Sequence, residues 1–330
     1  MLFSVKEFKE ALFNINESNF VSHALALFQY QAKNNSIYRE YLKLLGVTAE
    51  KVRSLNEIPF LPIDFFKTHN VVTGDPAVKI IFESSGTTGL NTSRHLVADP
   101  EFYLSVSEKI FQLQFGNVAN YNIVALLPSY LERTNSSLVY MVKYFTSLCS
   151  GEATGFFLNE FEIVNRIIEE SAILKNKLVV FGVTFALLDL CASSKGSDKE
   201  FYIIETGGMK GRRKEMIREE VHYQFKTKFP KAVICSEYGM TELLSQAYAL
   251  NGSIFTSPPW MKVMFRNIND PFHIDNSIKR GGINVIDLAN IDSCAFIETK
   301  DLGENMGEGR FKVLGRFDNA DIRGCNLLVV

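Results

Sequence analysis

The sequence has no long apolar run and no strong excess of either charge. The longest apolar stretch among its 330 residues, 178–188, is closed by Asp189 and falls far short of the roughly 20 residues that a membrane span needs. Lysine and arginine together number 35, against 37 aspartate and glutamate residues. A chain without a basic footprint is not expected to bind nucleic acid. The sequence therefore predicts a soluble protein with no membrane span and no nucleic-acid partner.

Cysteine pairs and a signal peptide are missing as well. The five cysteines form an odd set without a Cys-X-X-Cys motif, and the first ten residues, MLFSVKEFKE, carry charges where a signal peptide needs an apolar core. Reduced thiols in a cytoplasmic protein are therefore expected. Hydrophobic residues make up 46% of the chain, so a chain of this length can bury a large core without disulfides or metal ions.

Strands and helices alternate along most of the chain, which predicts an α/β fold. The first 75 residues favour helices at 5–13, 22–33 and 36–45, and Pro59 and Pro62 then enforce extended backbone. Further on, helical stretches alternate with β-rich runs, which indicates mostly parallel sheets with flanking helices. These runs lie at 78–82, 122–127, 177–183, 201–205 and 231–235.

Two further patterns complete the predicted organisation. Apolar residues recur every four positions from Ile217 to Phe229, which predicts a helix from near Gly211 to just before Pro230. From Trp260 onward the strands become short and rich in turns, which suggests a small β-barrel-like subdomain. Four regions are predicted: a mainly helical N-terminal region at 1–75, an α/β core at 76–256, a small β-rich subdomain at 257–314, and a hinge-like segment with a C-terminal tail at 315–330.

A glycine-punctuated loop directly follows the strand predicted at 78–82. Its two glycines let successive N–H groups point into one concavity, and its serine and threonine hydroxyls add donors, so the loop could hold a polyphosphate. It is not a Walker A loop, because no Gly-Lys-[Ser/Thr] follows. From the residues alone, a plain turn between a strand and a helix is an equally good interpretation. The loop consists of Ser84, Ser85, Gly86, Thr87, Thr88 and Gly89.

A second motif, SEYGMTE at 236–242, again follows an apolar strand. It offers an aromatic stacking face, a glycine turn, a hydroxyl donor for phosphate and a carboxylate. Magnesium prefers hard oxygen ligands and is often held by one carboxylate together with substrate phosphates. The alternative interpretation is a strand-to-helix turn with Glu242 in the first helical turn, where the helix dipole favours a negative charge.

Taken together, the two motifs resemble the adenylate-forming, acyl-CoA synthetase-like superfamily. Further segments match in the expected order: TGGMKG at 206–211, TKDLG at 299–303 and GRFDNADIRG at 315–324. Longer strings at 126–141, 237–248, 258–263 and 313–325 are similar to the acyl-protein synthetase branch, the LuxE-type fatty acid–protein ligases. The similarity runs from about Ile58 to the C-terminus.

The resemblance implies the fold of the large N-terminal domain of these enzymes, with ATP and Mg²⁺ as cofactors. Two departures stand out. The lysine that often follows the phosphate loop is missing, and Lys300 stands where many members have a glycine. The implied roles are phosphate binding by Ser84, Ser85, Gly86, Thr87, Thr88 and Gly89; the adenine side by Gly207, Gly208, Glu237, Tyr238 and Gly239; α-phosphate contact by Thr241; Mg²⁺ binding by Glu242; ribose contact by Asp301; and ribose or phosphate contact by Arg316.

The resemblance also implies a reaction. A carboxylic acid, expected to be a fatty acid, would be activated to acyl-AMP and then form a thioester on a protein cysteine. Full-length superfamily members carry a C-terminal lid domain, which is expected to be absent here. Cys325 matches the acyl-carrying cysteine of the LuxE-type family, although from residue properties alone a small buried residue in a strand is the better interpretation.

Other interpretations stay open. The acyl group could pass to coenzyme A or to a carrier-protein thiol, or the chain could be a non-catalytic nucleotide-binding scaffold of a fatty acid reductase-like complex. The possible partners are therefore an acyl-accepting reductase or a carrier protein. His95, just after the phosphate loop, could contact a phosphate or the acyl carboxylate, but a structural role is the simpler interpretation.

Overall fold

The computed structural model describes residues 3–84, 92–127, 135–207, 216–275 and 277–317. Seven of the residues with predicted roles lie outside these ranges: Ser85, Gly86, Thr87, Thr88, Gly89, Gly208 and Cys325.

The N-terminal region is helical, as the sequence predicts. Helices α1 (Val5–Ala11), α2 (Glu17–Asn34) and α3 (Ser36–Leu44) are followed by the short α4 (Phe65–Thr68). Helix α2 begins five residues before the predicted start because Asn16 caps it, with its side chain accepting from the Ser18 N–H in a capping box that also involves Asn19. Single 3₁₀ turns occur at Leu12–Asn14, Ala49–Lys51, Leu55–Glu57, Val118–Asn120 and Ser171–Ile173.

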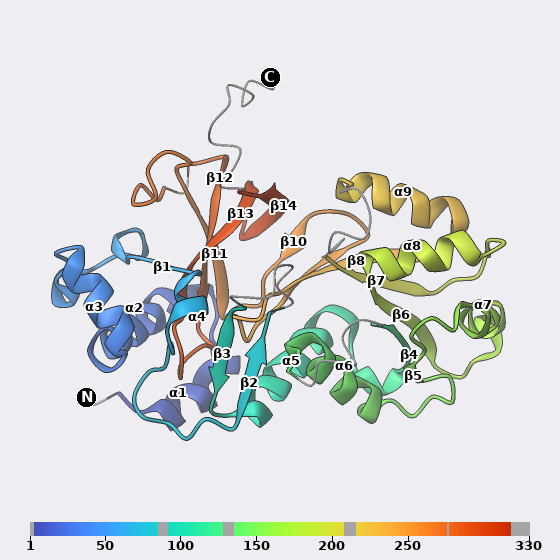
Figure 1. The fold of residues 1–330 in the computed structure, drawn as a ribbon, viewed down its shortest axis with the longest axis horizontal. Coiled ribbons are helices and arrows are strands. Elements are labelled where there is room, and N and C mark those ends of the chain that lie inside the picture. The colour runs from blue at the N-terminus through green and yellow to red at the C-terminus, as the bar shows by residue number, and fades with distance from the viewer. Residues whose placement is uncertain (1–2, 85–91, 128–134, 208–215, 276, 318–330) are drawn as a thin grey trace.

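Twelve of the described strands form one continuous sheet (Figure 1). One end of the sheet, from β5 to β8, is parallel and the other end, from β9 to β11, is antiparallel, with the change of direction between β8 and β9. In spatial order the strands are β11 (Met261–Arg266), β12 (Arg280–Asp287), β13 (Phe296–Gly307), β14 (Arg310–Arg316), β10 (Phe255–Thr256), β9 (Ala247–Leu250), β8 (Val233–Tyr238), β7 (Tyr202–Thr206), β6 (Lys177–Val183), β4 (Tyr121–Leu126) and β5 (Gly155–Phe156). The two-residue β1 (Leu61–Pro62) pairs with β13.

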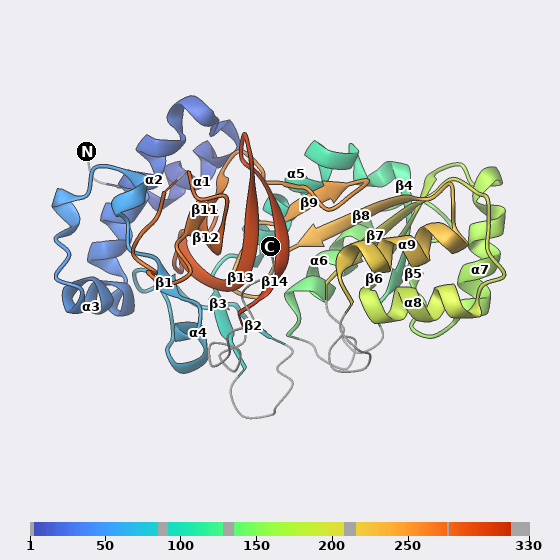
Figure 2. The same cartoon turned by 90° about the horizontal axis from the view of Figure 1, so that it is seen from above.

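Helices cover both faces of the parallel strands. Helices α5 (Pro100–Phe115) and α6 (Ser137–Leu148) lie on one side of β4–β8, and α8 (Thr184–Ser193) and α9 (Arg218–Lys228) lie on the other (Figure 1). Helix α7 (Phe161–Glu170) lies at the end of the sheet farthest from the N-terminal helices (Figure 2). A separate antiparallel pair, β2 (Ile80–Glu83) and β3 (Arg94–Val97), completes the described strands.

The structure corrects the predicted arrangement in two places. The C-terminal strands are not uniformly short, since β13 has 12 residues, and they are hydrogen-bonded into the same sheet as the parallel strands. Also, Ile217 does not belong to the apolar face of α9. It precedes the helix and is 61% exposed, whereas Val221 and Phe225 are buried.

The N-terminal helices are fastened to a segment close to the other end of the chain. The Gln31 amide nitrogen donates to the carbonyls of Asn290 and Ile291 at 2.9 and 3.0 Å, and its oxygen accepts from the Ala295 N–H at 2.9 Å. Buried hydrogen bonds of this kind fix the register of the two segments. The helical region therefore packs on the loop between β12 and β13.

Among the described helices, none is both long enough and apolar enough to cross a membrane. The long apolar stretch 178–188 divides into strand β6 and the buried first half of α8.

Candidate functional site

The glycine-rich loop has a well-defined base. The Ser84 N–H donates to the Ser93 carbonyl at 3.0 Å, and the Ser93 N–H donates to the Ser84 hydroxyl oxygen at 2.9 Å. One residue earlier, the Glu83 N–H donates to the carbonyl of Asn135 at 2.8 Å. The loop therefore connects two antiparallel strands, β2 and β3. The next described element is strand β3 and not a helix, so the alternative interpretation of a turn between a strand and a helix is wrong.

The base of this loop contacts the second motif. Nδ1 of His95, on β3, lies 2.8 Å from the Thr241 carbonyl oxygen. Burial lowers the pKa of His95 to about 4, so the ring is neutral and donates from Nδ1. The Ser93 hydroxyl lies close enough to the Glu242 carboxyl to lower its pKa, against the larger opposing effect of burial. Two motifs separated by about 150 residues therefore meet at one place, and His95 has the structural role.

A buried aspartate shapes the backbone after the second motif. Oδ2 of Asp287 accepts from the Leu244 and Ser245 N–H groups at 2.9 Å each, and Oδ1 accepts from the Ser245 hydroxyl at 2.7 Å. The Asn290 amide donates to the Glu242 carbonyl at 2.7 Å. The Glu242 carbonyl, which a helix would use as an acceptor for its own backbone, is thus occupied by a side chain. The chain continues into β9 without a helix, so the alternative interpretation of Glu242 in a first helical turn is wrong.

Glu242 is 5% exposed, and burial raises the pKa of its carboxyl. Across the described residues, no group of three or more His, Cys, Asp or Glu side chains is arranged to hold a metal ion. A single buried carboxylate beside a serine hydroxyl suits a magnesium ion that takes its remaining ligands from phosphates and water. Burial disfavours the ionised form of Glu242, and a bound cation would favour it. Glu242 therefore fits the predicted role.

Glu237 contacts Thr206 and the turn at Gly239. The Thr206 hydroxyl donates to Oε2 of Glu237 at 2.7 Å, since the two residues are paired across β7 and β8. The other oxygen lies under Gly239, where an added Cβ would be 2.3 Å from it. Burial raises the pKa of Glu237 to about 7. Glycine is therefore needed at position 239, because the Glu237 carboxylate leaves no room for a side chain. The sequence motif alone does not reveal this contact.

Tyr238, Asp301 and Arg316 form a connected group. The Tyr238 hydroxyl donates to Oδ2 of Asp301 at 2.8 Å, and Nε of Arg316 lies 3.5 Å from Oδ1. The Tyr238 ring is buried beside Phe255 and Phe311, with ring centroids 5.8 and 5.5 Å apart. Burial raises the pKa of Asp301. Three residues predicted to contact one nucleoside are thus within contact of each other.

Gly207 lies at the end of β7, one residue beyond the pair Thr206 and Glu237. It is exposed, and an added Cβ would have no heavy atom within 4 Å. This open position beside the second motif fits the predicted adenine side. Of the described site residues, Ser84, Thr241 and Glu242 are linked through Ser93 and His95. Tyr238 and Arg316 are each linked to Asp301.

A second cluster of polar side chains lies on the α8–α9 face. Glu205 accepts from the hydroxyls of Thr184 and Ser236, the latter at 3.1 Å, and His222 lies 3.1 Å from the same Ser236 hydroxyl. The order of contacts is carboxylate, serine, histidine. A catalytic triad places the histidine in the middle, and Ser236 is fully buried. This cluster is therefore structural.

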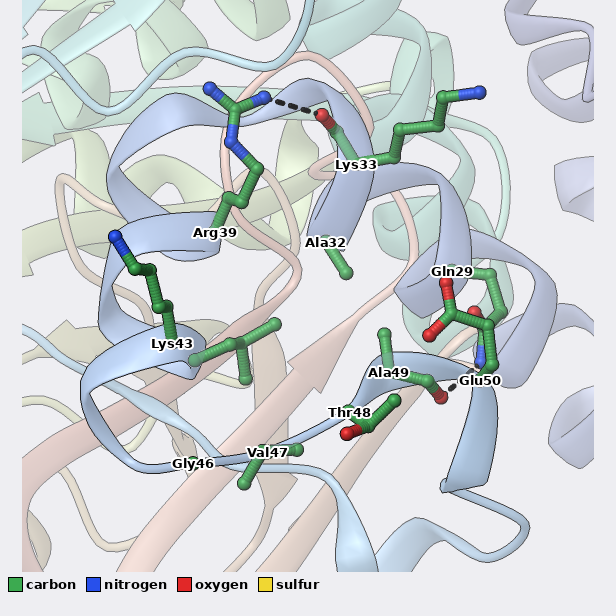
Figure 3. Close-up of a pocket in the computed structure, with 11 residues that line it drawn as sticks. Gln29, Ala32, Lys33, Arg39, Lys43, Gly46, Val47, Thr48, Ala49 and Glu50 are labelled. Carbon is green, nitrogen blue, oxygen red and sulfur yellow. Dashed lines mark hydrogen bonds between the residues drawn. The ribbon is translucent and has the colours of Figure 1, made fainter.

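A hollow of about 740 Å³ lies elsewhere, beside α2 and α3 (Figure 3). Its apolar lining residues include Ala32, Leu42 and Val47, while the side chains of Lys33 and Lys43 extend away from its centre. None of the residues with predicted roles lines it.

Sequence reasoning missed two residues that shape the site, Asp287 and Arg266. Both follow or end an apolar strand and look like ordinary surface charges in the sequence. Their burial, at 0% and 7% exposed, depends on partners far along the chain. One local signal for Arg266 exists in the Gly281–Gly282 pair, because an added Cβ at Gly282 would lie 2.4 Å from the Arg266 guanidinium carbon.

Comparison of the sequence with known proteins identifies a matching family and a relative. The profile of the family described as "Acyl-protein synthetase, LuxE" matches residues 6–330. A long-chain-fatty-acid–luciferin-component ligase of Vibrio harveyi is 25% identical over 338 aligned positions, which cover 91% of this chain and 84% of that protein.

Solved structures show the same fold. A 2-hydroxyisobutyryl-CoA ligase, in complex with 2-HIB-AMP and CoA, matches with a TM-score of 0.65 and 11% identity, covering 96% of this chain and 70% of that one. A luciferase-like enzyme of the nonluminescent mealworm Zophobas morio matches with a TM-score of 0.50 and 18% identity, covering 75% of this chain. The chain spans 60% of the length of the mealworm protein.

Proposed function

The chain belongs to the acyl-protein synthetase (LuxE) family, and on that premise we propose that it activates a fatty acid with ATP and transfers the acyl group to its own Cys325. The observation that carries this proposal is the contact between the two motifs. The His95–Thr241 hydrogen bond, with Ser93 close to Glu242, brings the base of the predicted phosphate-binding loop to a hydroxyl and a carboxylate.

The first step is adenylation. A carboxylic acid has a pKa of about 4.3 and is ionised at neutral pH, so no general base is needed. A carboxylate oxygen attacks the α-phosphorus of ATP, a new O–P bond forms, and the bond to pyrophosphate breaks with its electron pair. Catalysis then depends on positioning and on neutralising charge. Thr241 would contact the α-phosphate, Asp301 would accept from the ribose hydroxyls, and Glu242 would hold a magnesium ion that neutralises phosphate charge.

The second step is thioester formation. The Cys325 thiol loses its proton to solvent, and the thiolate sulfur attacks the carbonyl carbon of the acyl-adenylate. The C–S bond forms, the C–O bond to AMP breaks, and AMP leaves with the electron pair. A thioester keeps the acyl group activated, so an acyl-accepting reductase or a carrier protein is the proposed partner.

The described cysteines support Cys325 as the acceptor by elimination. Burial raises the pKa of the half-buried Cys149, raises that of Cys235 to about 11, and raises that of Cys294 to about 12. Cys191 is buried in α8. The thiolate is the nucleophilic form of cysteine, so these four are poor acyl acceptors. Free thiols also agree with the proposed cytoplasmic location.

The test uses two measurements on the purified chain. The first is carboxylate-dependent exchange of labelled pyrophosphate into ATP. The second is labelled long-chain fatty acid that stays on the protein through denaturation and is released by hydroxylamine. Wild type should show both activities, Cys325→Ser only the exchange, and the control Cys149→Ser both. No exchange would leave a nucleotide-binding scaffold as the better proposal. Full transfer by Cys325→Ser to coenzyme A would favour an acyl-CoA ligase.

A further inference from the structure

A cluster of buried polar side chains lies beneath Gly239. An added Cβ at this glycine would lie 2.3 Å from Oε1 of Glu237 and 3.3 Å from Cγ of Gln246, so both side chains reach the same place. Tyr248 on β9 is the direct partner of Glu237 on β8, which puts the two side chains on the same face of the sheet. Glu237, Gln246 and Tyr248 are 7%, 4% and 1% exposed. These three side chains form one buried polar cluster.

Two atoms of this cluster lack a hydrogen-bond partner. Among the described residues, nothing bonds to Oε1 of Gln246 or to the hydroxyl of Tyr248, and both atoms are buried. The Gln246 amide nitrogen is engaged, since it donates to the Leu244 carbonyl at 3.1 Å. An unpaired buried polar group costs about 1–3 kcal/mol, and folded proteins contain few of them. Two such atoms in one cluster therefore call for partners from outside the chain.

The surroundings of the cluster are aromatic. The Phe115 ring, on α5, lies edge-on to the Tyr248 ring, with centroids 5.2 Å apart. Burial raises the pKa of Tyr103, also on α5, and the Glu237 carboxylate raises it further because the two groups are close. The Tyr103 ring packs against Phe82 on β2, with centroids 5.2 Å apart. Apolar and aromatic walls with a few placed polar groups are the usual composition of a small-molecule site.

The cluster also lies close to the predicted α-phosphate contact. Gly239 precedes Thr241 by two residues, so their Cα atoms are at most about 7 Å apart. On the aromatic side, Phe82 precedes Ser84, at the base of the glycine-rich loop, by two residues as well. In the proposed reaction the substrate carboxylate meets the α-phosphate at Thr241. A substrate group that reaches the cluster is therefore only a few carbon atoms away from that carboxylate.

We propose that Gln246 and Tyr248 form a specificity subsite for a hydroxyl group of the substrate, and that the acid activated by this chain is a fatty acid hydroxylated near its carboxyl group. This inference rests on the proposed function and names its substrate class. A hydroxyl group can donate one hydrogen bond and accept others. It donates to Oε1 of Gln246 and accepts from the Tyr248 hydroxyl, so both unpaired atoms gain a partner. A plain fatty acid leaves both unpaired.

The test compares two kinds of acid by carboxylate-dependent pyrophosphate exchange. Wild type should use the better of 2- and 3-hydroxyhexadecanoate with a kcat/KM roughly 10- to 100-fold above that for hexadecanoate, because the plain chain leaves buried polar atoms unpaired. Tyr248→Phe keeps the ring and removes only the oxygen, and it should lower this ratio roughly 3- to 10-fold. Gln246→Leu removes the acceptor and should lower the ratio as well. Tyr223→Phe, the same change in a 74% exposed side chain on α9, is the matched control.

The ratio between the acids separates specificity from folding, because damage to the fold lowers exchange with both kinds of acid equally. A wild type that uses hexadecanoate as well as the hydroxy acids would overturn the inference and leave the proposed function standing. An unchanged ratio in both Tyr248→Phe and Gln246→Leu would overturn it too. A wild type without exchange on any of these acids overturns the proposed function, and the subsite with it.

Discussion

The Tyr238 hydroxyl donates a hydrogen bond to Oδ2 of Asp301, 2.8 Å away, while Arg316 approaches the other carboxylate oxygen at 3.5 Å. The carboxylate that would bind ribose is thus already engaged on both oxygens. A ribose hydroxyl must share or displace one of these contacts. The Arg316 side chain is 72% exposed, so its contact is weak and easily replaced.

This arrangement predicts that a substitution of Asp301 weakens nucleotide binding far more than a substitution of Tyr238. Asp301→Asn should weaken binding of Mg-ATP by roughly 10- to 100-fold, because hydrogen bonds to a charged acceptor are lost. Tyr238→Phe keeps the ring and frees Oδ2, so affinity should change by less than about threefold. Isothermal calorimetry measures both, with Glu304→Gln, elsewhere on β13, as the control. Equal losses in the two variants would contradict a ribose contact by Asp301.

A methyl group at Gly239 should be poorly tolerated. Its Cβ would lie 2.3 Å from Oε1 of Glu237, so either the carboxylate or the turn must move. We expect Gly239→Ala to lower the free energy of unfolding by about 1–3 kcal/mol and to reduce pyrophosphate exchange. Gly207→Ala is the matched comparison in urea denaturation, since no heavy atom lies within 4 Å of its added Cβ. Equal stability of the two variants would show that the turn adapts freely.

Glu237 should make stability depend on pH. Its pKa is about 7 in the folded chain, against an ordinary value of 4.5. The folded state therefore binds the proton more tightly, and stability is lost as pH rises through 7. We expect about 3 kcal/mol less stability from this group at pH 8 than at pH 5. Urea denaturation at several pH values measures the effect, and Glu237→Gln should remove it. A wild type and variant with parallel pH profiles would contradict the prediction.

Asp287 should be a strong determinant of stability and of the site. Asp287→Asn replaces an acceptor of two N–H groups by an amide, and we expect a loss of about 3 kcal/mol in the free energy of unfolding. The Glu242 turn depends on the same bonds, so exchange activity should fall with it. The control is Asp198→Asn, whose side chain is 74% exposed, with an expected change under about 0.5 kcal/mol. A stable, active Asp287→Asn would contradict this role.

Thiol reactivity offers a separate check on Cys325. Because burial raises the pKa of Cys149, Cys235 and Cys294, iodoacetamide at pH 7.5 should modify the native chain at Cys325 first. Mass spectrometry of peptides identifies the modified residue, and prior incubation with ATP, Mg²⁺ and fatty acid should protect it. Rapid modification of Cys235 or Cys294 would show that the fold opens more easily than described.

The sequence was most informative where a pattern is local. Strand β6 lies at the predicted residues 177–183, and α1 and α3 lie within one or two residues of their predicted ends. Patterns that depend on distant partners were not predictable. Nothing near Asp287 in the sequence, and for Arg266 only the Gly281–Gly282 pair, indicates that these charges are buried, because their partners come from other segments of the chain.

The candidate site likewise has parts that the sequence indicated and parts that it did not. Residue types and spacing indicated the loop at 84–89 and the motif at 236–242, and the structure brings the two together through His95. The individual roles toward a nucleotide stay predictions for Ser84, Gly207, Glu237, Tyr238, Thr241, Glu242, Asp301 and Arg316. The strand-to-helix alternatives failed because the next described element after each motif is a strand, β3 after the loop and β9 after the second motif.

The bonds from Gln31 to the loop before β13 span 259 to 264 positions of the chain. At roughly 5–20 residues per second, a ribosome needs on the order of 13 to 50 seconds to make the distance between them. During that interval helix α2 can pack on α3 but lacks the loop between β12 and β13. We therefore expect this face of α2 to stay accessible for most of synthesis, and its contacts with that loop to be among the last to form.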